Sequence, residues 1–490
     1  MTADTSAGTS AGTPAGGAEG VTRGAGWLGL GAGVVKAVQT VVLLLLAALL
    51  APSAIGVLAI GALVLNVTTA LTDLGSSTAL VHWRGDAERA ARSALSLAVG
   101  LAVAITAAMW FAAPAVAHVL NAGELGSDVL RGLMLCLPMY AVAGVSQELL
   151  RRELAFKRRV LPDIVGALSG GVLSVTLALL GHGAMSLVIG QLVQAALVMV
   201  LCWAMRPAVR PGWRGSDVAA LISYGGHLAG ANLLTLLMLN VDYLVVAHEL
   251  GAFSLGVYSM AFRLAYMPYL LVAVVIAGAA FAHLCRLRGA AVGAAVGEVA
   301  ARMTVLLVPL YLGVVLLAPQ LELLGAQWAA GVRPLRWLAV YGLVLSLLHL
   351  GLIALNAVGR TRDSFWLGGL HLALLTALLV TFVGRGVEAV AVAQVVAGLA
   401  TLLVTLPVLA RRIQGLDPRR WLGATRAVLA GAAAMTTVVL LAEALLPWTR
   451  VSYPGLALVG SAAVTTYLAV VLRLDQDALI PRLPALRRMR

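Results

Sequence analysis

Long apolar runs, each separated from the next by a short polar joint, repeat along almost the whole chain. Each run has roughly twenty residues or more, and a helix of about twenty residues crosses the roughly 30 Å hydrocarbon core of a bilayer. The pattern therefore predicts fourteen membrane-spanning helices. Their approximate ranges are 26–50, 54–81, 93–112, 129–149, 163–181, 183–204, 217–246, 254–282, 299–318, 334–357, 364–383, 386–409, 425–446 and 454–472.

The runs are apolar throughout and do not alternate with polar residues, as the strands of a transmembrane barrel would. Composition agrees, since 61% of the residues are apolar and only 11% are charged, against about 45–50% and 25% in soluble proteins. We predict an all-α, polytopic membrane protein.

The basic residues predict the orientation of the chain. The net charge is +13, and the joints after even-numbered helices, with the C-terminal tail, hold 24 Lys and Arg residues, while the joints after odd-numbered helices hold 3. Because cytoplasmic joints carry the excess of Lys and Arg, both termini are predicted to be cytoplasmic. The charge lies in joints and not in a folded basic domain, so we expect no nucleic-acid partner.

Two stretches two hundred positions apart are similar, which suggests an internal repeat. Residues 49–68 read LLAPSAIGVLAIGALVLNVT and residues 249–268 read ELGAFSLGVYSMAFRLAYMP. The matched positions are Leu50 with Leu250, Ile55 with Leu255, Gly56 with Gly256, and Val57 with Val257.

The repeat predicts an N-lobe of helices 1–6 and a C-lobe of helices 7–12, with helices 13 and 14 added. Six crossings separate helix 1 from helix 7, so both run in the same direction, as in parallel repeats that rock around a central cavity. The predicted divisions are a disordered cytoplasmic tail at 1–25, the N-lobe at 26–215, the C-lobe at 216–410, helices 13 and 14 at 411–472, and a basic cytoplasmic tail at 473–490.

Two cations lie inside apolar runs, where a charge costs at least about 2.5–3.5 kcal/mol and usually faces a cavity or a partner. Lys36 is about 15 Å into helix 1 from the cytoplasmic end, and Arg263 is about 14 Å into helix 8 from the outer end. Both depths are near the midplane, so the lobes would enclose an electropositive cavity. Alternatively, Lys36 extends to the inner headgroups and Arg263 pairs with a buried carboxylate such as Asp242 or Glu249.

Polar residues in the same helices extend this candidate site. Gln39 follows Lys36 by three positions and shares its side of the helix. The other candidates for substrate binding are Asn66 in helix 2 and Asn232 and Asn240 in helix 7. Asp73 and Asp242 are candidates for coupling to an ion. Alternatively, the amides join neighbouring helices, and the two carboxylates lie at headgroup level.

Catalytic and cofactor motifs are not recognised. The chain has no GxxxxGK[ST] loop, its joints are too short for a catalytic domain, and Cys136, Cys202 and Cys285 lack metal-site spacing. The first 25 residues have no apolar segment typical of a secretory signal. We predict that the protein is not an enzyme and uses neither a cofactor nor a metal.

Four segments of the chain read LLAPSAIGVLAIG, TDLGSSTALV, LLRRELAFKRR and NVDYLVVAHELGAFSLGVYSMAFRLAYMP. Together they resemble the polysaccharide exporters, or Wzx-type flippases, of the MOP superfamily, and the resemblance covers about residues 25–410. It implies two six-helix lobes, alternating access, and transfer of undecaprenyl-diphosphate-linked oligosaccharide to the outer leaflet of a bacterial plasma membrane. Glycosyltransferases and a polymerase of the same pathway would be partners, beside the membrane lipids.

The same resemblance separates the possible cargoes. Relatives that flip the peptidoglycan precursor have cations in the central cavity, which Lys36 and Arg263 match by position, but charges on the helices here are sparse. A capsule, lipopolysaccharide or other surface glycan unit is therefore favoured. A multidrug exporter of the superfamily would need a midplane carboxylate where this chain has Lys36, and a glycan ligase or polymerase would need a large outer loop.

Overall fold

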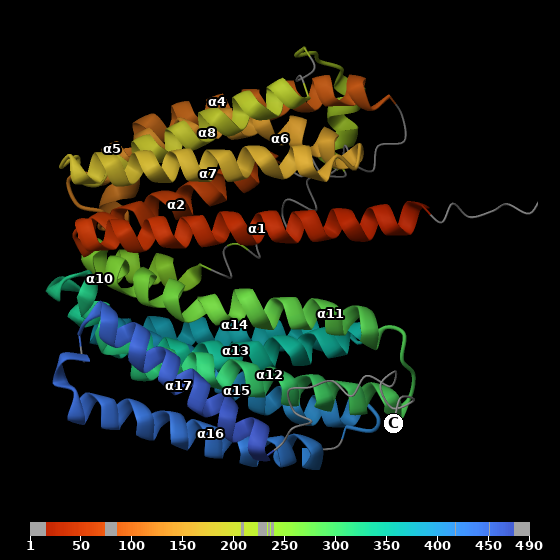
Figure 1. The fold of residues 1–490 in the computed structure, drawn as a ribbon. Helices are drawn as coiled ribbons and strands as arrows, with labels where there is room; N and C mark the ends of the chain where they lie inside the picture. Colours follow the sequence, from red (N-terminus) through yellow and green to blue (C-terminus); the bar gives the residue numbers. More distant parts are fainter. Residues whose placement is uncertain are drawn as a thin grey trace, which may run out of the picture.

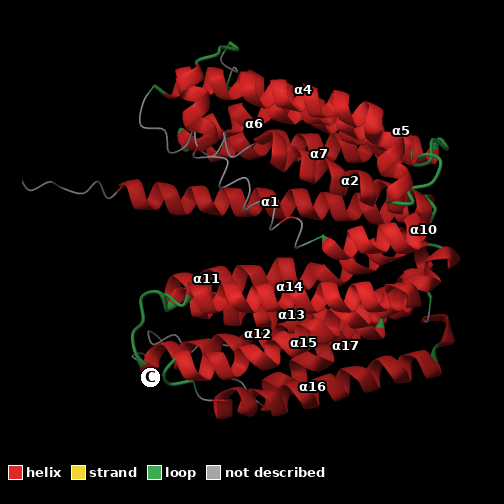
Figure 2. Cartoon of the chain, turned by 180° about the vertical axis from the view of Figure 1, so that it is seen from behind, coloured by secondary structure: helices red, strands yellow, loops and turns green. Residues whose placement is uncertain are grey.

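The computed structural model describes residues 16–73, 86–206, 210–223, 233, 236, 240–416, 418–449 and 451–474. All regular structure in these ranges is helical (Figure 2). The first helices are α1 (Gly16–Leu49), α2 (Pro52–Asp73), α4 (Ala87–Val119), α5 (Gly126–Met134), α6 (Cys136–Arg152), α7 (Phe156–Leu179) and α8 (Met185–Met205). The later α-helices are α10 (Val241–Pro268), α11 (Val274–Leu284), α12 (Ala290–Leu316), α13 (Val332–Ala357), α14 (Thr361–Phe382), α15 (Val387–Arg412), α16 (Pro418–Leu445) and α17 (Tyr453–Leu474). Five short helices complete the set, a π-helix η1 (Tyr269–Ala273) and the 3-10 helices η2 (Ala318–Leu324), η3 (Ala326–Gly331), η4 (Val383–Arg385) and η5 (Pro447–Thr449).

Twelve helices in the described part of the chain are long and apolar enough to cross a membrane. They correspond to twelve of the fourteen predicted segments. The segment predicted at 26–50 is α1, whose described apolar portion is the shorter stretch Gly33–Leu49. Most of the segment predicted at 217–246 lies outside the described residues. The described structure therefore confirms an all-helical membrane protein and gives a count of twelve where fourteen were predicted.

The helices form two groups on either side of α1 (Figure 1). We call residues 16–223 the N-terminal half and residues 240–474 the C-terminal half. In the first, α7 packs on α1 and α8, while α4 and α6 pack on each other; in the second, α13 packs on α12 and α15. The final pair, α16 and α17, packs on α12 at the outer side of the C-terminal half (blue in Figure 1).

The Asp86 side chain caps the N-terminus of α4. The Asp86 carboxylate accepts hydrogen bonds from the backbone N–H groups of Glu88 and Arg89 at 3.1 and 3.2 Å. These N–H groups have no partner within the helix, and an acidic N-cap satisfies them.

The helix labelled α10 is a hairpin of two helical segments that meet at Gly251. This residue has φ 75°, outside the helical range and well tolerated only by glycine. Tyr258 donates a hydrogen bond of 2.6 Å to the Asp242 carboxylate, although sixteen residues of continuous helix would separate them by about 24 Å. The chain therefore reverses direction at Gly251, and α10 contains the end of one predicted span and the beginning of the next.

The two halves meet closely where α2 crosses α10. A Cβ on Gly56 would overlap the carbonyl of Ala252, and a Cβ on Gly256 would overlap the carbonyl of Pro52. The two glycines matched in the predicted repeat are thus in backbone contact across the interface. Small residues of this kind allow helices in a membrane to approach closely.

Further contacts join the halves at the same end of the molecule, which we call the closed end. The Asn121 side chain donates to the His248 carbonyl, and the Ala252 N–H donates to the Asn121 carbonyl at 3.2 Å. The indole N–H of the fully buried Trp328 donates to the carbonyl of Ala47 at 2.8 Å. Both halves therefore contribute backbone groups to this interface.

Candidate functional site: a cavity between the two halves

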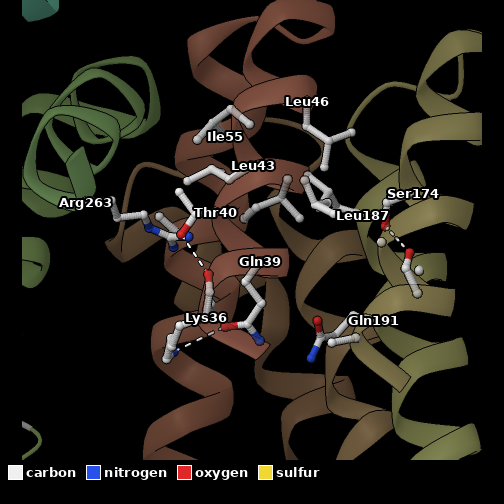
Figure 3. A pocket seen from close by; sticks show the side chains of 18 of the residues that line it. Lys36, Gln39, Thr40, Leu43, Leu46, Ile55, Ser174, Leu187, Gln191 and Arg263 are labelled. Carbon is white, nitrogen blue, oxygen red and sulfur yellow. Dashed lines mark hydrogen bonds between the residues drawn. The ribbon is translucent and has the colours of Figure 1, made fainter. Parts of the chain in front are cut away.

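A cavity of about 560 Å³ lies between the halves (Figure 3). Its wall is built by α1, α2, α7 and α8 of the N-terminal half and by α10 with the adjoining π-helix of the C-terminal half. The helices reach it with their middle portions, as Gly170 and Gly171 of α7 illustrate. The cavity is therefore deep within the apolar helices.

Most of the residues predicted to bind substrate line this cavity. They are Lys36, Gln39, Asn66, Asn240 and Arg263. The structure thus brings together five residues from α1, α2 and the α10 region that are far apart in the sequence. The sixth, Asn232, lies outside the described residues. Their role in binding remains a prediction.

The two cations belong to one edge of the cavity, where α1 faces α10. Lys36 Nζ donates to Gln39 Oε1 at 3.2 Å. The Thr40 hydroxyl, one turn further along α1, contacts Met267 Sδ at 3.7 Å, and Met267 is one turn beyond Arg263. Arg263 reaches from α10 toward Thr40 in Figure 3. Lys36 and Arg263 thus approach the same contact between the halves from its two sides.

The two cations lie at similar distances from the closed end. Lys36 precedes the end of α1 at Leu49 by about 20 Å of helix, and Arg263 follows the turn at Gly251 by about 18 Å. Both distances start from the closed end, so the two charges lie at a similar level of the helix bundle, and their place near the membrane midplane remains a prediction.

Within the described ranges, neither alternative carboxylate pairs with Arg263. Asp242 is buried and accepts hydrogen bonds from Tyr258 and from Gln394, the latter at 3.0 Å. The Glu249 carboxylate lies 3.8 Å from Nε2 of the neighbouring His248. Among the described residues, neither Lys36 nor Arg263 forms an ion pair. Both side chains are exposed toward the cavity.

A second wall of the cavity is polar but uncharged, and we call it the amide wall. It consists of Asn66 of α2, Ser174 of α7, and Gln191 and Gln194 of α8. Of these four residues, only Asn66 was predicted from the sequence. The available signal was the pair of glutamines three positions apart in an otherwise apolar helix, a spacing that places them on one helix face.

Aromatic side chains of α10 surround Arg263. Tyr243, Phe262 and Tyr266 all line the cavity. The ring centroids of Tyr243 and Phe262 are 5.9 Å apart, and those of Phe262 and Tyr266 are 5.3 Å apart. Such a stack gives the cavity a rigid aromatic lining on the side of Arg263.

The residues predicted to couple an ion do not line the cavity. Asp242 is one residue from the lining residue Tyr243, and its carboxylate is held between Tyr258 and Gln394. Asp73 is the last residue of α2 and is partly buried. Only Asp242 is therefore adjacent to the candidate site.

Comparison with known proteins gives a consistent family and fold. A family model described as polysaccharide biosynthesis protein matches residues 45–333, more than half of the chain. The succinoglycan biosynthesis transport protein ExoT of Rhizobium meliloti is 27% identical, over 71% of this chain and 72% of its own. The lipopolysaccharide biosynthesis protein WzxC of Escherichia coli is 23% identical over half of each chain.

Solved structures resemble the whole fold. The lipid II flippase MurJ in an inward closed conformation matches 92% of this chain and 99% of its own, with a TM-score of 0.74 and 13% identity. A MATE family multidrug transporter in an inward-facing conformation matches 76% of this chain and 95% of its own, with a TM-score of 0.57 and 16% identity. The MATE family transporter is of the MOP superfamily. At these identities the likeness concerns the fold.

Proposed function

The chain belongs to the family of polysaccharide biosynthesis proteins, and from this premise we propose that it is a lipid flippase for surface polysaccharide assembly. It is a multi-span protein of the bacterial plasma membrane. The proposed cargo is undecaprenyl-diphosphate-linked oligosaccharide, moved from the cytoplasmic to the outer leaflet. Glycosyltransferases that make this cargo and a polymerase that consumes it would be its partners.

The charge of the cavity is the observation that carries this proposal. Among its described lining residues are two cations, Lys36 and Arg263, and no carboxylate. A diphosphate is the anion that such a pair would neutralise, and the planar guanidinium can donate two parallel hydrogen bonds to phosphate oxygens. In this proposal Arg263 clamps the diphosphate and Lys36 supplies the second positive charge.

The membrane potential supplies free energy for the proposed direction. Each negative charge that moves outward through an inside-negative potential of 100 mV releases about 2.3 kcal/mol. A diphosphate with about two charges would release about 4–5 kcal/mol. Export of the lipid is therefore favourable without hydrolysis of ATP.

Contacts at the closed end support alternating access. Helices of the two halves are in backbone contact there, near Gly56 and Gly256. In the predicted orientation the closed end faces outward, and the chain would be in an inward-facing state that receives lipid from the cytoplasmic leaflet. Separation of the closed end would then release the cargo outward.

The proposed coupling residues are Asp242 and Asp73. Asp242 is the better placed, because Tyr258 and Gln394 connect it to two different helical segments of the C-terminal half. Binding of a cation or a proton at this carboxylate would weaken these hydrogen bonds and alter the packing beside Tyr243. This change would reach the cavity through α10.

Drug export is the alternative that the MATE-like fold raises. A cavity for cationic drugs needs a negative charge, since a buried cation without a partner is costly. The described lining has the opposite sign. Lipid-linked glycan is therefore the better match.

Replacement of Arg263 tests the proposed function. In a strain whose surface glycan depends on this chain, Arg263→Ala should lower glycan assembly by about ten- to a hundredfold, the effect of losing charge-assisted hydrogen bonds. Surface glycan is measured on whole cells, and an immunoblot of the tagged chain verifies membrane insertion. Arg302→Ala is the matched control, because Arg302 lies on another helix and pairs with Glu298. Wild-type glycan in the Arg263 variant would exclude the clamp.

A further inference from the structure

We infer that the amide wall is a subsite for an uncharged sugar, bound beside the diphosphate. The inference rests on the proposed function and adds the chemical class of the first sugar residues of the cargo. It follows from two properties of the wall formed by Asn66, Ser174, Gln191 and Gln194: its free hydrogen-bonding groups and its lack of charge.

The wall has unused donors and acceptors. Gln191 Nε2 donates to the Tyr140 hydroxyl at 2.7 Å, which orients the amide and leaves Oε1 as an acceptor. The Ser174 hydroxyl donates to the Gly170 carbonyl at 2.8 Å and is buried in the contact between α7 and α8, so it makes the wall polar without offering a free acceptor. In the described part of the chain, the side chains of Asn66 and Gln194 form no hydrogen bond to another residue.

Sugar hydroxyls match these groups. Each hydroxyl is both a donor and an acceptor, and each amide presents two donor hydrogens and an acceptor oxygen. A polar group that leaves water is costly unless it finds a partner in the site. The amide wall would satisfy several hydroxyls at once, which an apolar wall could not do.

The positions of the charges exclude an acidic sugar at this wall. Lys36 lies on α1 and Arg263 lies on α10. Gln191 and Ser174 lie on the opposite side of the cavity in Figure 3. A diphosphate would occupy both cations. A uronate beside the amide wall would then be a buried carboxylate with no described cation to neutralise it.

Three lipids distinguish this inference from the proposed function. The purified full chain in nanodiscs is titrated with polyisoprenyl diphosphate, with the same lipid carrying a neutral disaccharide, and with the same lipid carrying a uronate-containing disaccharide, and the dissociation constants are compared. We expect the neutral disaccharide to tighten binding about tenfold over the bare lipid, the gain from one or two hydrogen bonds to neutral groups. The uronate lipid should lack this gain.

Substitution of Gln194 locates the subsite. Gln194→Leu preserves size and removes the amide, so it should abolish the gain from the neutral disaccharide and leave binding of the bare lipid unchanged. Gln191→Leu is a second variant whose thermal stability is checked, because it also loses the bond to Tyr140. Gln327→Leu, at an exposed position in η3 away from the cavity, is the matched control.

Each outcome tests either the sugar subsite or the proposed function. An undiminished gain in both Gln194→Leu and Gln191→Leu, or a uronate lipid that binds as tightly as the neutral one, overturns the sugar subsite. Failure of all three lipids to bind the unsubstituted chain overturns the proposed function instead. Arg263→Ala should weaken all three lipids equally, which separates the phosphate contact from the sugar contact.

Discussion

The two ends of the molecule are held together in different ways. At the closed end, backbone groups of the two halves touch each other around Gly56 and Gly256. At the opposite end, the described ion pairs of Arg206 join α4, α6 and α8 of the N-terminal half. There Arg412 of α15 likewise pairs with Asp363 of α14 at 2.9 Å, within the C-terminal half.

This difference fits the proposal that the two halves move as units. The described ion pairs at the opposite end each lie within one half and do not attach it to the other. The contacts at Gly56 are between halves, so their loss would separate the two units while each keeps its own packing. Packed interfaces between two units are the kind that switch between two discrete arrangements, which suits the proposed alternating access.

The largest expected effect comes from a methyl group at the contact between Gly56 of α2 and Gly256 of α10, which we call the glycine crossing. Gly56→Ala places a Cβ against the Ala252 carbonyl, and overpacking of this kind costs about 1–3 kcal/mol. The closed state should therefore lose population about five- to a hundredfold. Spin labels at Leu125→Cys and Phe253→Cys, two exposed positions at the closed end, report the separation of the halves by pulsed electron resonance.

The label experiment has simple controls. Of the native cysteines, Cys136 and Cys202 are buried, so only the exposed Cys285 needs replacement by serine. Gly100→Ala in α4 adds the same methyl group where no atom lies within 4 Å, and it should not change the label distance. An unchanged distance in Gly56→Ala would show that the backbone crossing does not hold the ends together.

An intermediate effect is expected from Trp328→Phe. This change removes the hydrogen bond to the Ala47 carbonyl and keeps most of the buried ring, so it should cost about 1 kcal/mol and shift the closed population about fivefold. The same label pair measures it, with Trp366→Phe at an exposed position as control. A larger shift than in Gly56→Ala would assign closure to side chains and not to the backbone crossing.

Residue counting from the sequence predicts that the two cations lie at a common level. Lys36 and Arg263 were each placed near the midplane from helix ends alone, and both line the cavity at similar depth. The matched glycines Gly56 and Gly256 indicated a repeat. Their contact could not be predicted, because similarity between two segments does not specify that they pack against each other.

The uncharged wall of the cavity could not be predicted for a related reason. A glutamine in an apolar helix can join two helices or face a cavity, and its spacing gives only the helix face. Gln191 does both, since it bonds Tyr140 and lines the cavity. Asp73 was selected by charge alone, and the described cavity does not include it. Whether Gln191 faces the cavity depends on how α7 packs against α8, and the sequence does not specify this packing.

The smallest effect is expected at the end opposite the glycine crossing. Arg206 donates to Glu88 at 2.9 Å and to Glu153 at 2.8 Å, and the bond to Glu88 holds its pKa above the ordinary value. A raised pKa means that this stabilisation is lost only in strongly alkaline solution, so it is constant near neutral pH. Because the pairs are exposed, Arg206→Ala should lower the Tm by no more than about 2 °C, and less at high salt. Arg286→Ala is the control, and any change in the label distance at Leu125 and Phe253 would contradict the independence of the two ends.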